Sequence, residues 1–296
     1  MDWIREGEVS LPTTPGEPDE LRALRPWVLE EPDGTLRMWY TGDDGTTSRI
    51  LTAVRLPGGG WERLGLAIDA GLAGDTDSYG AESPCVVKTP GGYLMVYGGF
   101  DGEAGRLHMA TSVDSRQWDS QGTIMQRGPE DESGANHPCL WITGERWWLY
   151  FTGYSRAGGR DRSVIFAAVS QTGASWDRVG TVLEPEPGEA GVSHPCVLEV
   201  SRTCYLFYAS DVGGSFRIAL ATSSDGIEWD RRGAVLVPAG RGPDGASVHT
   251  PCAVRRHDGS VAMWYAGLPV GDDQFGYRIC SATFPAPGPT SAPWAR

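Results

Sequence analysis

The feature that most constrains the fold of this chain is a unit of about 55 residues that recurs five times. Its anchor is a proline that opens an apolar run, and successive copies lie 58, 54, 57 and 56 residues apart. The five prolines are Pro26, Pro84, Pro138, Pro195 and Pro251. Each copy continues into a second apolar run such as YLMVYGG, a third such as RIALATS, and in four copies a fourth built on tryptophan, such as WDRRG. Short runs of this composition, separated by Gly and Asp, are typical of β-strands joined by tight turns.

Four strands per unit is typical of a propeller blade, because one small sheet cannot cover its own faces and must stack on its neighbours. The fifth unit ends after its third strand and lacks a tryptophan strand. Residues 2–12 align without a gap on residues 228–238, with Trp, Arg, Gly, Val and Pro at the same offsets. We therefore predict an all-β, five-bladed β-propeller in which the N-terminal strand closes the last blade and residues 1–296 form one domain.

Composition narrows the class of partner. The 38 acidic against 25 basic residues, a formal charge of −13, disfavour nucleic acid and anionic membranes as partners. No apolar stretch reaches the roughly 18 residues of a spanning helix, and the charged start MDWIREGEVS is unlike a signal peptide, so we expect a cytoplasmic protein with no membrane partner.

The cysteines follow the repeat. Four of the six come directly after a repeated proline: Cys85, Cys139, Cys196 and Cys252. Copies of one position fall in different blades, so we expect free thiols and not disulfides. The chain lacks CxxC, HExxH, Walker and GxSxG motifs, so any site must be assembled from scattered residues.

The most informative positions are the two residues before each repeated proline, because the first strand of each blade lines the central channel. They are Leu24 and Arg25, Glu82 and Ser83, Asn136 and His137, Ser193 and His194, and His249 and Thr250. Three of the five histidines and a single carboxylate lie in this ring. Two structural interpretations remain open. In the first, the histidines recur because the whole blade was duplicated, and their imidazoles bind neighbouring backbone. In the second, Glu82 forms a salt bridge with Arg25.

These considerations give a set of candidate residues. The candidates for catalysis are Glu82, His194, His137, His249 and Asp211, the last because blade four lies across the channel from blade two. The candidates for substrate binding are Arg25, Asn136, Asp77, Tyr79, Phe100, Asp101 and Tyr154. The aspartates in this set are also common in Gly-rich turns for structural reasons. The aromatic residues in the set, Tyr79, Phe100 and Tyr154, offer stacking surfaces for a sugar.

The repeated phrases, an apolar strand ending in YTG or YAS, an ALATSSDG-like stretch and a W-x-R-x-G strand, resemble the five-bladed propellers of the arabinanase, levansucrase and invertase superfamily, notably glycoside hydrolase family forty-three. In that family an Asp directly before the first-blade proline acts as base and a Glu two residues before a later proline acts as acid. Here Arg25 stands at the first position, and Glu82 matches the second but lies in blade two. The usual carboxylate pair of an inverting hydrolase is therefore missing.

The resemblance implies a glycosidase-like enzyme acting on a glycoside or sugar-derived small molecule in the central funnel, with Glu82 as general acid and His194 or Asp211 activating water. The alternative is a diverted lyase, cyclase or isomerase of specialised metabolism that uses His137, His194 and His249. A third interpretation is a non-catalytic sugar-binding propeller. No cofactor is expected, although the three histidines with Glu82 are a possible set of ligands for a divalent metal.

Overall fold

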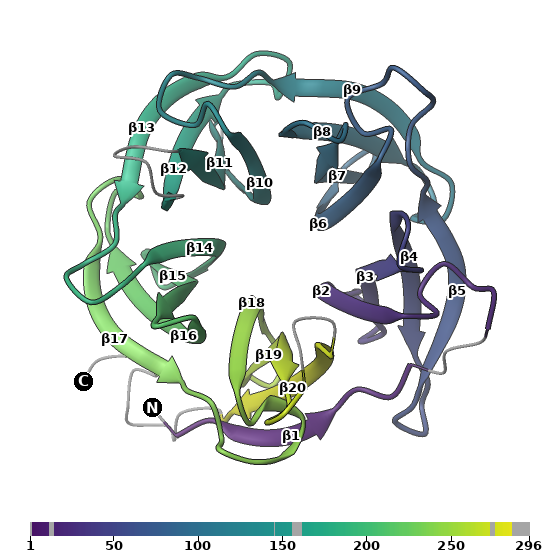
Figure 1. Ribbon diagram of the computed structural model, residues 1–296, viewed down its shortest axis with the longest axis vertical. Helices are drawn as coiled ribbons and strands as arrows, with labels where there is room; N and C mark the ends of the chain where they lie inside the picture. Colours follow the sequence, from purple (N-terminus) through teal and green to yellow (C-terminus); the bar gives the residue numbers. More distant parts are fainter. Residues whose placement is uncertain (1, 12–14, 145, 156–161, 273–275, 286–296) are drawn as a thin grey trace.

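The structure, a computed structural model, describes residues 2–11, 15–144, 146–155, 162–272 and 276–285. Its strands form five four-stranded antiparallel groups arranged around a common axis (Figure 1). Blade one comprises β2 (Arg22–Glu30), β3 (Leu36–Asp43), β4 (Ser48–Arg55) and β5 (Trp61–Ile68). Blade two comprises β6 (Gly80–Thr89), β7 (Gly92–Phe100), β8 (Gly105–Ser112) and β9 (Asp119–Met125).

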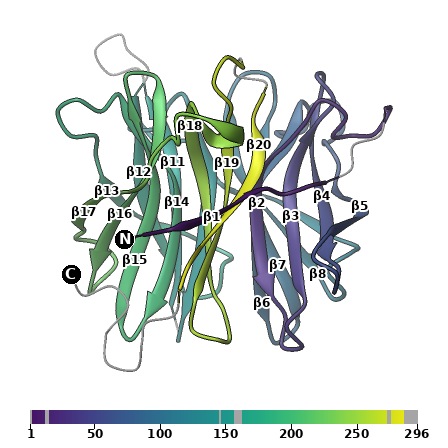
Figure 2. The ribbon, with the colours of Figure 1, turned by 90° about the horizontal axis from the view of Figure 1, so that it is seen from below.

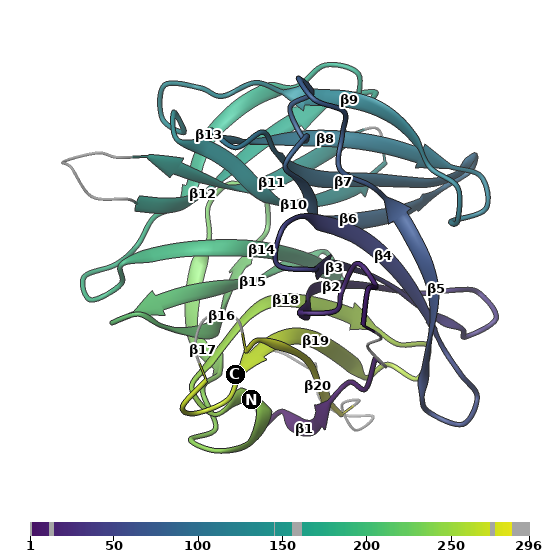
Figure 3. The ribbon, with the colours of Figure 1, turned by 45° about the vertical axis from the view of Figure 1, so that its right-hand side comes forward.

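The next two blades repeat this order. Blade three comprises β10 (Gly134–Thr143), β11 (Arg146–Ser155), β12 (Arg162–Ser170) and β13 (Asp177–Leu183). Blade four comprises β14 (Gly191–Val200), β15 (Thr203–Val212), β16 (Ser215–Ser223) and β17 (Asp230–Leu236). The first strand of each blade lies nearest the axis and the fourth lies on the perimeter, as Figures 1 and 3 show. The predicted all-β propeller is confirmed.

Blade five is built from both ends of the chain. It comprises β18 (Ser247–Arg255), β19 (Val261–Leu268), β20 (Arg278–Phe284) and the N-terminal strand β1 (Ile4–Glu8). β1 runs antiparallel along β20, with Ile4 opposite Thr283 and Glu8 opposite Cys280 (Figure 2). The predicted closure of the last blade by the N-terminus is thereby confirmed.

The blades are joined at the axis by the side chain that follows each repeated proline. In four blades this residue is a buried cysteine, and all six cysteines are free thiols. Each of the four sulfurs accepts a hydrogen bond from the backbone N–H of the next blade. The bonds are Leu140 N to Cys85 Sγ at 3.0 Å, Val197 N to Cys139 Sγ at 3.2 Å, Ala253 N to Cys196 Sγ at 3.3 Å and Val28 N to Cys252 Sγ at 3.1 Å.

Blade one has Trp27 at the position of the cysteine. Its indole Nε1 donates to the carbonyl oxygen of Val86 in blade two at 2.8 Å, so the indole makes the fifth contact of the same ring. Trp27 packs against all five hydrophobic core clusters. One large side chain on the axis therefore connects the cores that the five blades build between them.

The part of the chain that the structure describes contains no helix with the length and apolar character needed to cross a membrane.

Removing the N-terminal strand tests how the ring is closed. Deleting residues 1–8 removes β1 and leaves the edge of β20 unpaired, so the protein should lose its single cooperative unfolding transition and aggregate. Urea unfolding followed by circular dichroism measures this. A truncated protein that unfolds cooperatively at the parent's urea midpoint would show that β1 is dispensable.

Truncating the axial indole tests its role between the blades. Trp27→Ala should lower the free energy of unfolding by about 3–5 kcal/mol, because it leaves a void shared by five cores. Trp118→Ala is the matched control, since Trp118 is also partly buried but packs against a single cluster. The two variants are compared by urea unfolding, and an equal loss in both would contradict an axial role for Trp27.

Candidate functional site

The backbone turns five side chains towards the axis. The residue before each repeated proline adopts a left-handed conformation, with φ between 52° and 55°. These residues are Arg25, Ser83, His137, His194 and Thr250. At each of these points the register between the first and second strands shifts, which marks a β-bulge. Left-handed backbone is uncommon for residues other than glycine and is held here by the surrounding structure, as is typical of functional sites.

Glu82 is the carboxylate of this ring, and both of its oxygens are occupied. Arg25 of blade one forms an ion pair with Oε2, and the Nδ2 of Asn136 in blade three donates to Oε1. The side chains of Arg25 and Glu82 are 23% and 17% exposed, so the pair is shielded but open on one side. Gly98 makes room for this arrangement, because a Cβ there would lie 2.0 Å from the Oδ1 of Asn136. The ion pair with Arg25 and the hydrogen bond from Asn136 together fix the position of the Glu82 side chain.

The three ring histidines lie together. The ring centroids of His137 and His194 are 3.6 Å apart, and those of His194 and His249 are 5.2 Å apart. The Nδ1 of His137 is 3.2 Å from the hydroxyl of Tyr154, and the Nδ1 of His194 is 2.8 Å from the hydroxyl of Ser193. The repeat thus brings three imidazoles from three blades into one cluster.

The environment keeps these imidazoles neutral. Burial lowers the pKa of His137 and of His194 well below the ordinary value for histidine, and the positive charge of Arg25 lowers both further. Burial and then the charge of Arg25 lower the pKa of His249 to about 3. At neutral pH the cluster therefore contains proton acceptors and uncharged hydrogen-bonding groups, and no imidazolium acid.

Two aromatic residues that our sequence analysis missed pack against His249. The ring centroid of Tyr277 lies 4.2 Å from that of His249, and the centroid of Phe216 lies 5.4 Å away. Both directly precede an arginine that recurs at the start of the third strand, Arg217 in one case and Arg278 in the other. Their position directly before a repeated arginine could therefore have identified them from the sequence.

A cleft opens where β2 and β6 begin. Its volume is about 920 Å³, within the range of roughly 300–1,000 Å³ typical of small-molecule sites. Arg22, Asp43, Tyr79 and Phe100 line it. The rings of Tyr79 and Phe100 are 63% and 40% exposed and meet edge to face, with centroids 6.4 Å apart.

The ion pair of the ring is not among the residues that line this cleft. Arg25 comes three residues after Arg22 on β2, and Glu82 comes three residues after Tyr79, so at most about 10 Å of chain separates each member of the pair from the lining. By contrast, the cavity on the axis itself has a volume of about 30 Å³, which suits one water molecule and not a sugar.

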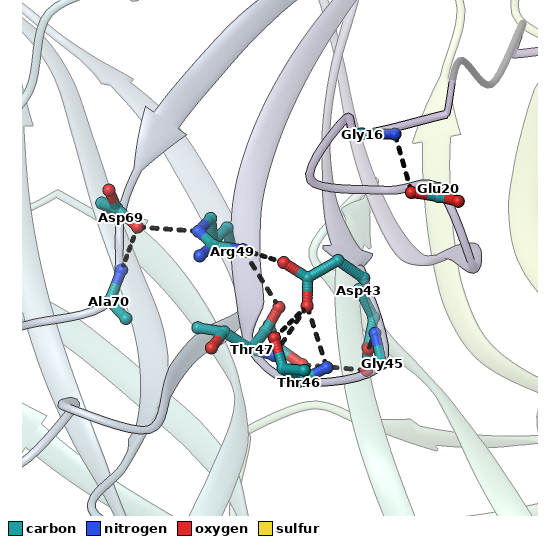
Figure 4. A network of polar contacts seen from close by, with 11 residues as sticks. Gly16, Glu20, Asp43, Gly45, Thr46, Thr47, Arg49, Asp69 and Ala70 are labelled. Carbon is teal, nitrogen blue, oxygen red and sulfur yellow. Dashed lines mark hydrogen bonds and ion pairs between the residues drawn. The ribbon is translucent and has the colours of Figure 1, made fainter.

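The wall of the cleft formed by the β3–β4 turn is held by hydrogen bonds (Figure 4). Asp43 Oδ1 accepts from the N–H of Gly45 at 2.6 Å, and Asp43 Oδ2 binds Arg22 Nη2 at 2.6 Å. Arg49 joins the same turn to Asp69 at 2.9 Å. The polar side of the cleft is therefore fixed before any ligand arrives.

Asp77 lies away from the ring. It is buried and accepts a hydrogen bond from the hydroxyl of Tyr97 at 3.0 Å. Asp77 is one of five buried acids that precede the first strands: Asp19, Asp77, Asp131, Glu189 and Asp244. In the other four blades an arginine of the fourth strand pairs with the acid, namely Arg63, Arg178, Arg231 and Arg5. Asp77 is thus the blade-two copy of a repeated contact inside the blade.

Asp101 and Asp211 also lie outside the ring, at turns. Asp101 Oδ1 accepts from the N–H groups of Glu103 and Ala104 at 2.9 and 2.8 Å. The bond from Ala104 is the main cause that lowers the pKa of Asp101 to about 2. Asp211 Oδ1 accepts from the N–H of Gly214 at 2.8 Å. The structure brings Glu82, Arg25 and Asn136 together with the histidine cluster and Tyr154, and it places these two aspartates elsewhere.

The proposed set of metal ligands is not arranged as one. Among the residues that the structure describes, no group of three or more His, Cys, Asp or Glu side chains is placed to hold a metal ion. The rings of His137 and His194 lie against each other at an interplanar angle of 36°, and the oxygens of Glu82 face Arg25 and Asn136. The donor set therefore does not fit a divalent cation in this geometry.

The fold is shared with solved carbohydrate enzymes. A structure titled "Glycoside hydrolase" superposes with a TM-score of 0.78 at 16% identity, covering 97% of this chain and 95% of that chain. A thermostable family-43 glycoside hydrolase gives 0.74 at 15% identity, covering 97% and 100%, and an alpha-L-arabinofuranosidase from Lactobacillus brevis gives 0.70 at 13% identity, covering 92% and 93%. This is the propeller fold of family-43-like glycoside hydrolases. At these identities the likeness establishes the fold alone.

Sequence relatives add little about activity. No protein-family model matches the chain. "Uncharacterized protein MT1551" of Mycobacterium tuberculosis (strain CDC 1551 / Oshkosh) is 28% identical over 168 residues, and "Uncharacterized protein Rv1502" (strain ATCC 25618 / H37Rv) is 27% identical over 168 residues. Each alignment covers 53% of this chain and 54% of the relative, so the chain spans about half the length of the curated relatives it matches.

The low pKa of His249 predicts a specific loss of stability in acid. Its folded pKa is about 3 and an unfolded histidine has a pKa of about 6.5, so the unfolded state takes up the proton first as the pH falls. Stability is therefore full above about pH 6.5 and declines towards pH 3. Between pH 7 and 5 this histidine should account for a loss of about 2 kcal/mol.

Urea unfolding of His249→Gln at both pH values measures this contribution. The variant should lose less stability than the parent between pH 7 and 5, and His257→Gln, which changes an exposed histidine, serves as control. An identical acid loss in His249→Gln and the parent would contradict a buried neutral imidazole at position 249.

Proposed function

We propose that this protein is a glycosidase-like enzyme that acts on a glycoside or a sugar-derived small molecule. The observation that carries the proposal is the cleft where β2 and β6 begin, which has an exposed aromatic pair in its lining and the Arg25–Glu82 pair three residues further along the chain. Aromatic faces beside polar side chains suit a sugar ring, which is apolar on its faces and polar at its edge. The fold shared with glycoside hydrolases supports the same substrate class.

In this proposal the sugar packs against Tyr79 and Phe100, and the bond to be cleaved lies towards Glu82. For Glu82 to act as general acid, its ion pair with Arg25 must open when the substrate enters, and its carboxylate must take up a proton from solvent, which it then donates to the leaving oxygen. Arg25 and Asn136, once released, become donors for the hydroxyl groups of the sugar. The unliganded geometry is then a resting state in which two binding groups hold the acid.

The group that activates water is His194 in this mechanism. A neutral imidazole can accept a proton from water, and burial keeps His194 neutral. Asp211, the other candidate, is engaged in its own turn with Gly214.

Six free thiols agree with the reducing cytoplasm that we expect for this chain.

A second candidate rests on a specific observation: Arg25 stands where the family has its catalytic base, and both oxygens of Glu82 are occupied. A lyase, cyclase or isomerase that uses the histidine cluster does not need a carboxylate base at the position of Arg25. Turnover in ¹⁸O-labelled water separates the two, because hydrolysis incorporates the label into the product and elimination or isomerisation does not.

Substituting Glu82 tests the proposal. Glu82→Gln preserves the shape of the side chain and removes the transferable proton, so kcat/KM on a glycoside found by screening aryl glycosides should fall about a hundredfold or more. Glu103→Gln, an exposed change on the same face, is the matched control. Equal activity in the two variants, with unchanged urea midpoints, would show that Glu82 takes no part in catalysis.

A further inference from the structure

Glu82 occupies a place in the structure that is built for a carboxylate. Its Oε2 is paired with the guanidinium of Arg25, and its Oε1 accepts a hydrogen bond from the Nδ2 of Asn136, so each oxygen has a donor of its own. Charge-assisted hydrogen bonds to both oxygens hold a carboxylate in one orientation and are among the strong hydrogen bonds in proteins. We call Arg25 and Asn136 the carboxylate clamp.

The clamp is also positioned by contacts that do not involve Glu82. The Oδ1 of Asn136 accepts a hydrogen bond from the backbone N–H of His137 at 2.7 Å, so the Nδ2 is the atom that faces the carboxylate. Gly98 on β7 leaves the room that the Asn136 side chain needs. The backbone of Arg25 is fixed by the bulge before Pro26. The two donors therefore suit any carboxylate that takes the place of Glu82.

The mechanism proposed above changes the charge of this place. When Glu82 leaves the clamp and takes up a proton, its negative charge is lost, whereas the guanidinium of Arg25 keeps its positive charge. In the described part of the chain Glu82 is the carboxylate paired with Arg25, and the three ring histidines are neutral. A neutral sugar would leave the shielded guanidinium without a counter-charge, which is costly away from water. A carboxylate on the substrate restores the balance.

The acids that line the cleft, Asp43 and Asp272, do not supply this charge, because both are engaged. Asp43 binds Arg22 at 2.6 Å, and Asp272 pairs with Arg278 at 2.9 Å. The substrate is therefore the source of a new carboxylate for Arg25.

We propose that the substrate is an acidic sugar, a glycoside of a uronic acid, whose carboxylate replaces that of Glu82 between Arg25 and Asn136. The inference rests on the proposed glycosidase function and names its substrate class. One carboxylate is exchanged for another, and the displaced Glu82 takes up a proton from solvent and serves as the acid. A neutral sugar has no charge to exchange and leaves Glu82 in the clamp.

Binding of free uronic acids tests the clamp without requiring turnover. The Tm of the full chain should rise with the concentration of sodium D-glucuronate or D-galacturonate, because a ligand that binds the folded state stabilises it. At equal ionic strength, D-glucose, D-galactose and sodium acetate should need concentrations at least about tenfold higher for the same rise. D-Glucose 6-sulfate tests charge alone, and a response equal to that of the uronates would overturn the assignment to a carboxylate.

Substituting the clamp arginine locates the binding. Arg25→Gln should abolish the preference for uronate over the neutral sugar, and Arg25→Lys, which keeps the charge, should retain part of it. Arg106→Gln is the matched control, since it also removes an arginine paired with an aspartate, Asp101, but outside the ring. An undiminished preference in Arg25→Gln would refute the clamp. If Arg25→Gln fails to fold, the comparison of ligands on the parent protein still decides the question.

Hydrolysis of paired aryl glycosides separates this inference from the proposed function. The kcat/KM of the parent should be about a hundredfold higher on a 4-nitrophenyl glucuronide or galacturonide than on the matching glucoside or galactoside. Equal or faster cleavage of the neutral partner would overturn the inference and leave the glycosidase function standing. Uronate binding that depends on Arg25, without cleavage of any glycoside, would contradict the glycosidase function and leave the acidic-sugar site. If no uronate raises the Tm beyond its neutral counterpart, the inference is wrong.

Discussion

The structure depends on one contact made five times around the axis. The side chain after each repeated proline bonds to the backbone of the next blade, through a thiol in four blades and through the Trp27 indole in blade one. A thiol is small and a weak acceptor, so it lets backbones approach without filling the axis. Five such residues would leave a channel; the single tryptophan occupies that space and packs on every core cluster.

The same contact positions the candidate site. The proline and the residue after it are held against the neighbouring blade, and the bulge just before them forces the preceding residue into the left-handed region. Its side chain then faces the axis whatever its chemistry, which is why arginine, serine, threonine and histidine all occur there. A repeated structural constraint thus provides five positions that face the axis and whose residues can differ from blade to blade.

The sequence predicted the fold well because the repeat carries it. The strand pattern, the closure by residues 2–12 and the unpaired cysteines all follow from comparing copies. The site was predictable in part: ring membership identified Glu82 and the three histidines, and the Arg25–Glu82 pair was one of two interpretations left open. From the sequence, Asp77 could not be distinguished from a functional residue. Blade four has Glu189 in place of an aspartate at the corresponding position, and the partner of the acid differs between blades, so the repeated contact is hard to recognise. The contacts of Phe216 and Tyr277 with His249 depend on how blades four and five pack, which no single strand encodes.

Departures from fivefold symmetry meet at one junction. Blade one alone has tryptophan in place of cysteine and arginine before its proline, and blade two alone places a carboxylate in the ring. These two blades also form most of the lining of the cleft, through β2, the β3–β4 turn and the start of β6, and Gly271, Asp272 and Gly276 of blade five complete it. Because stacking requires every blade to keep the shared contacts, a difference at one blade persists only where packing tolerates it. The charged pair joins blades one and two, and the aromatic pair lines the cleft on the same side, so the departures from the repeat gather at one junction and are not spread around the ring.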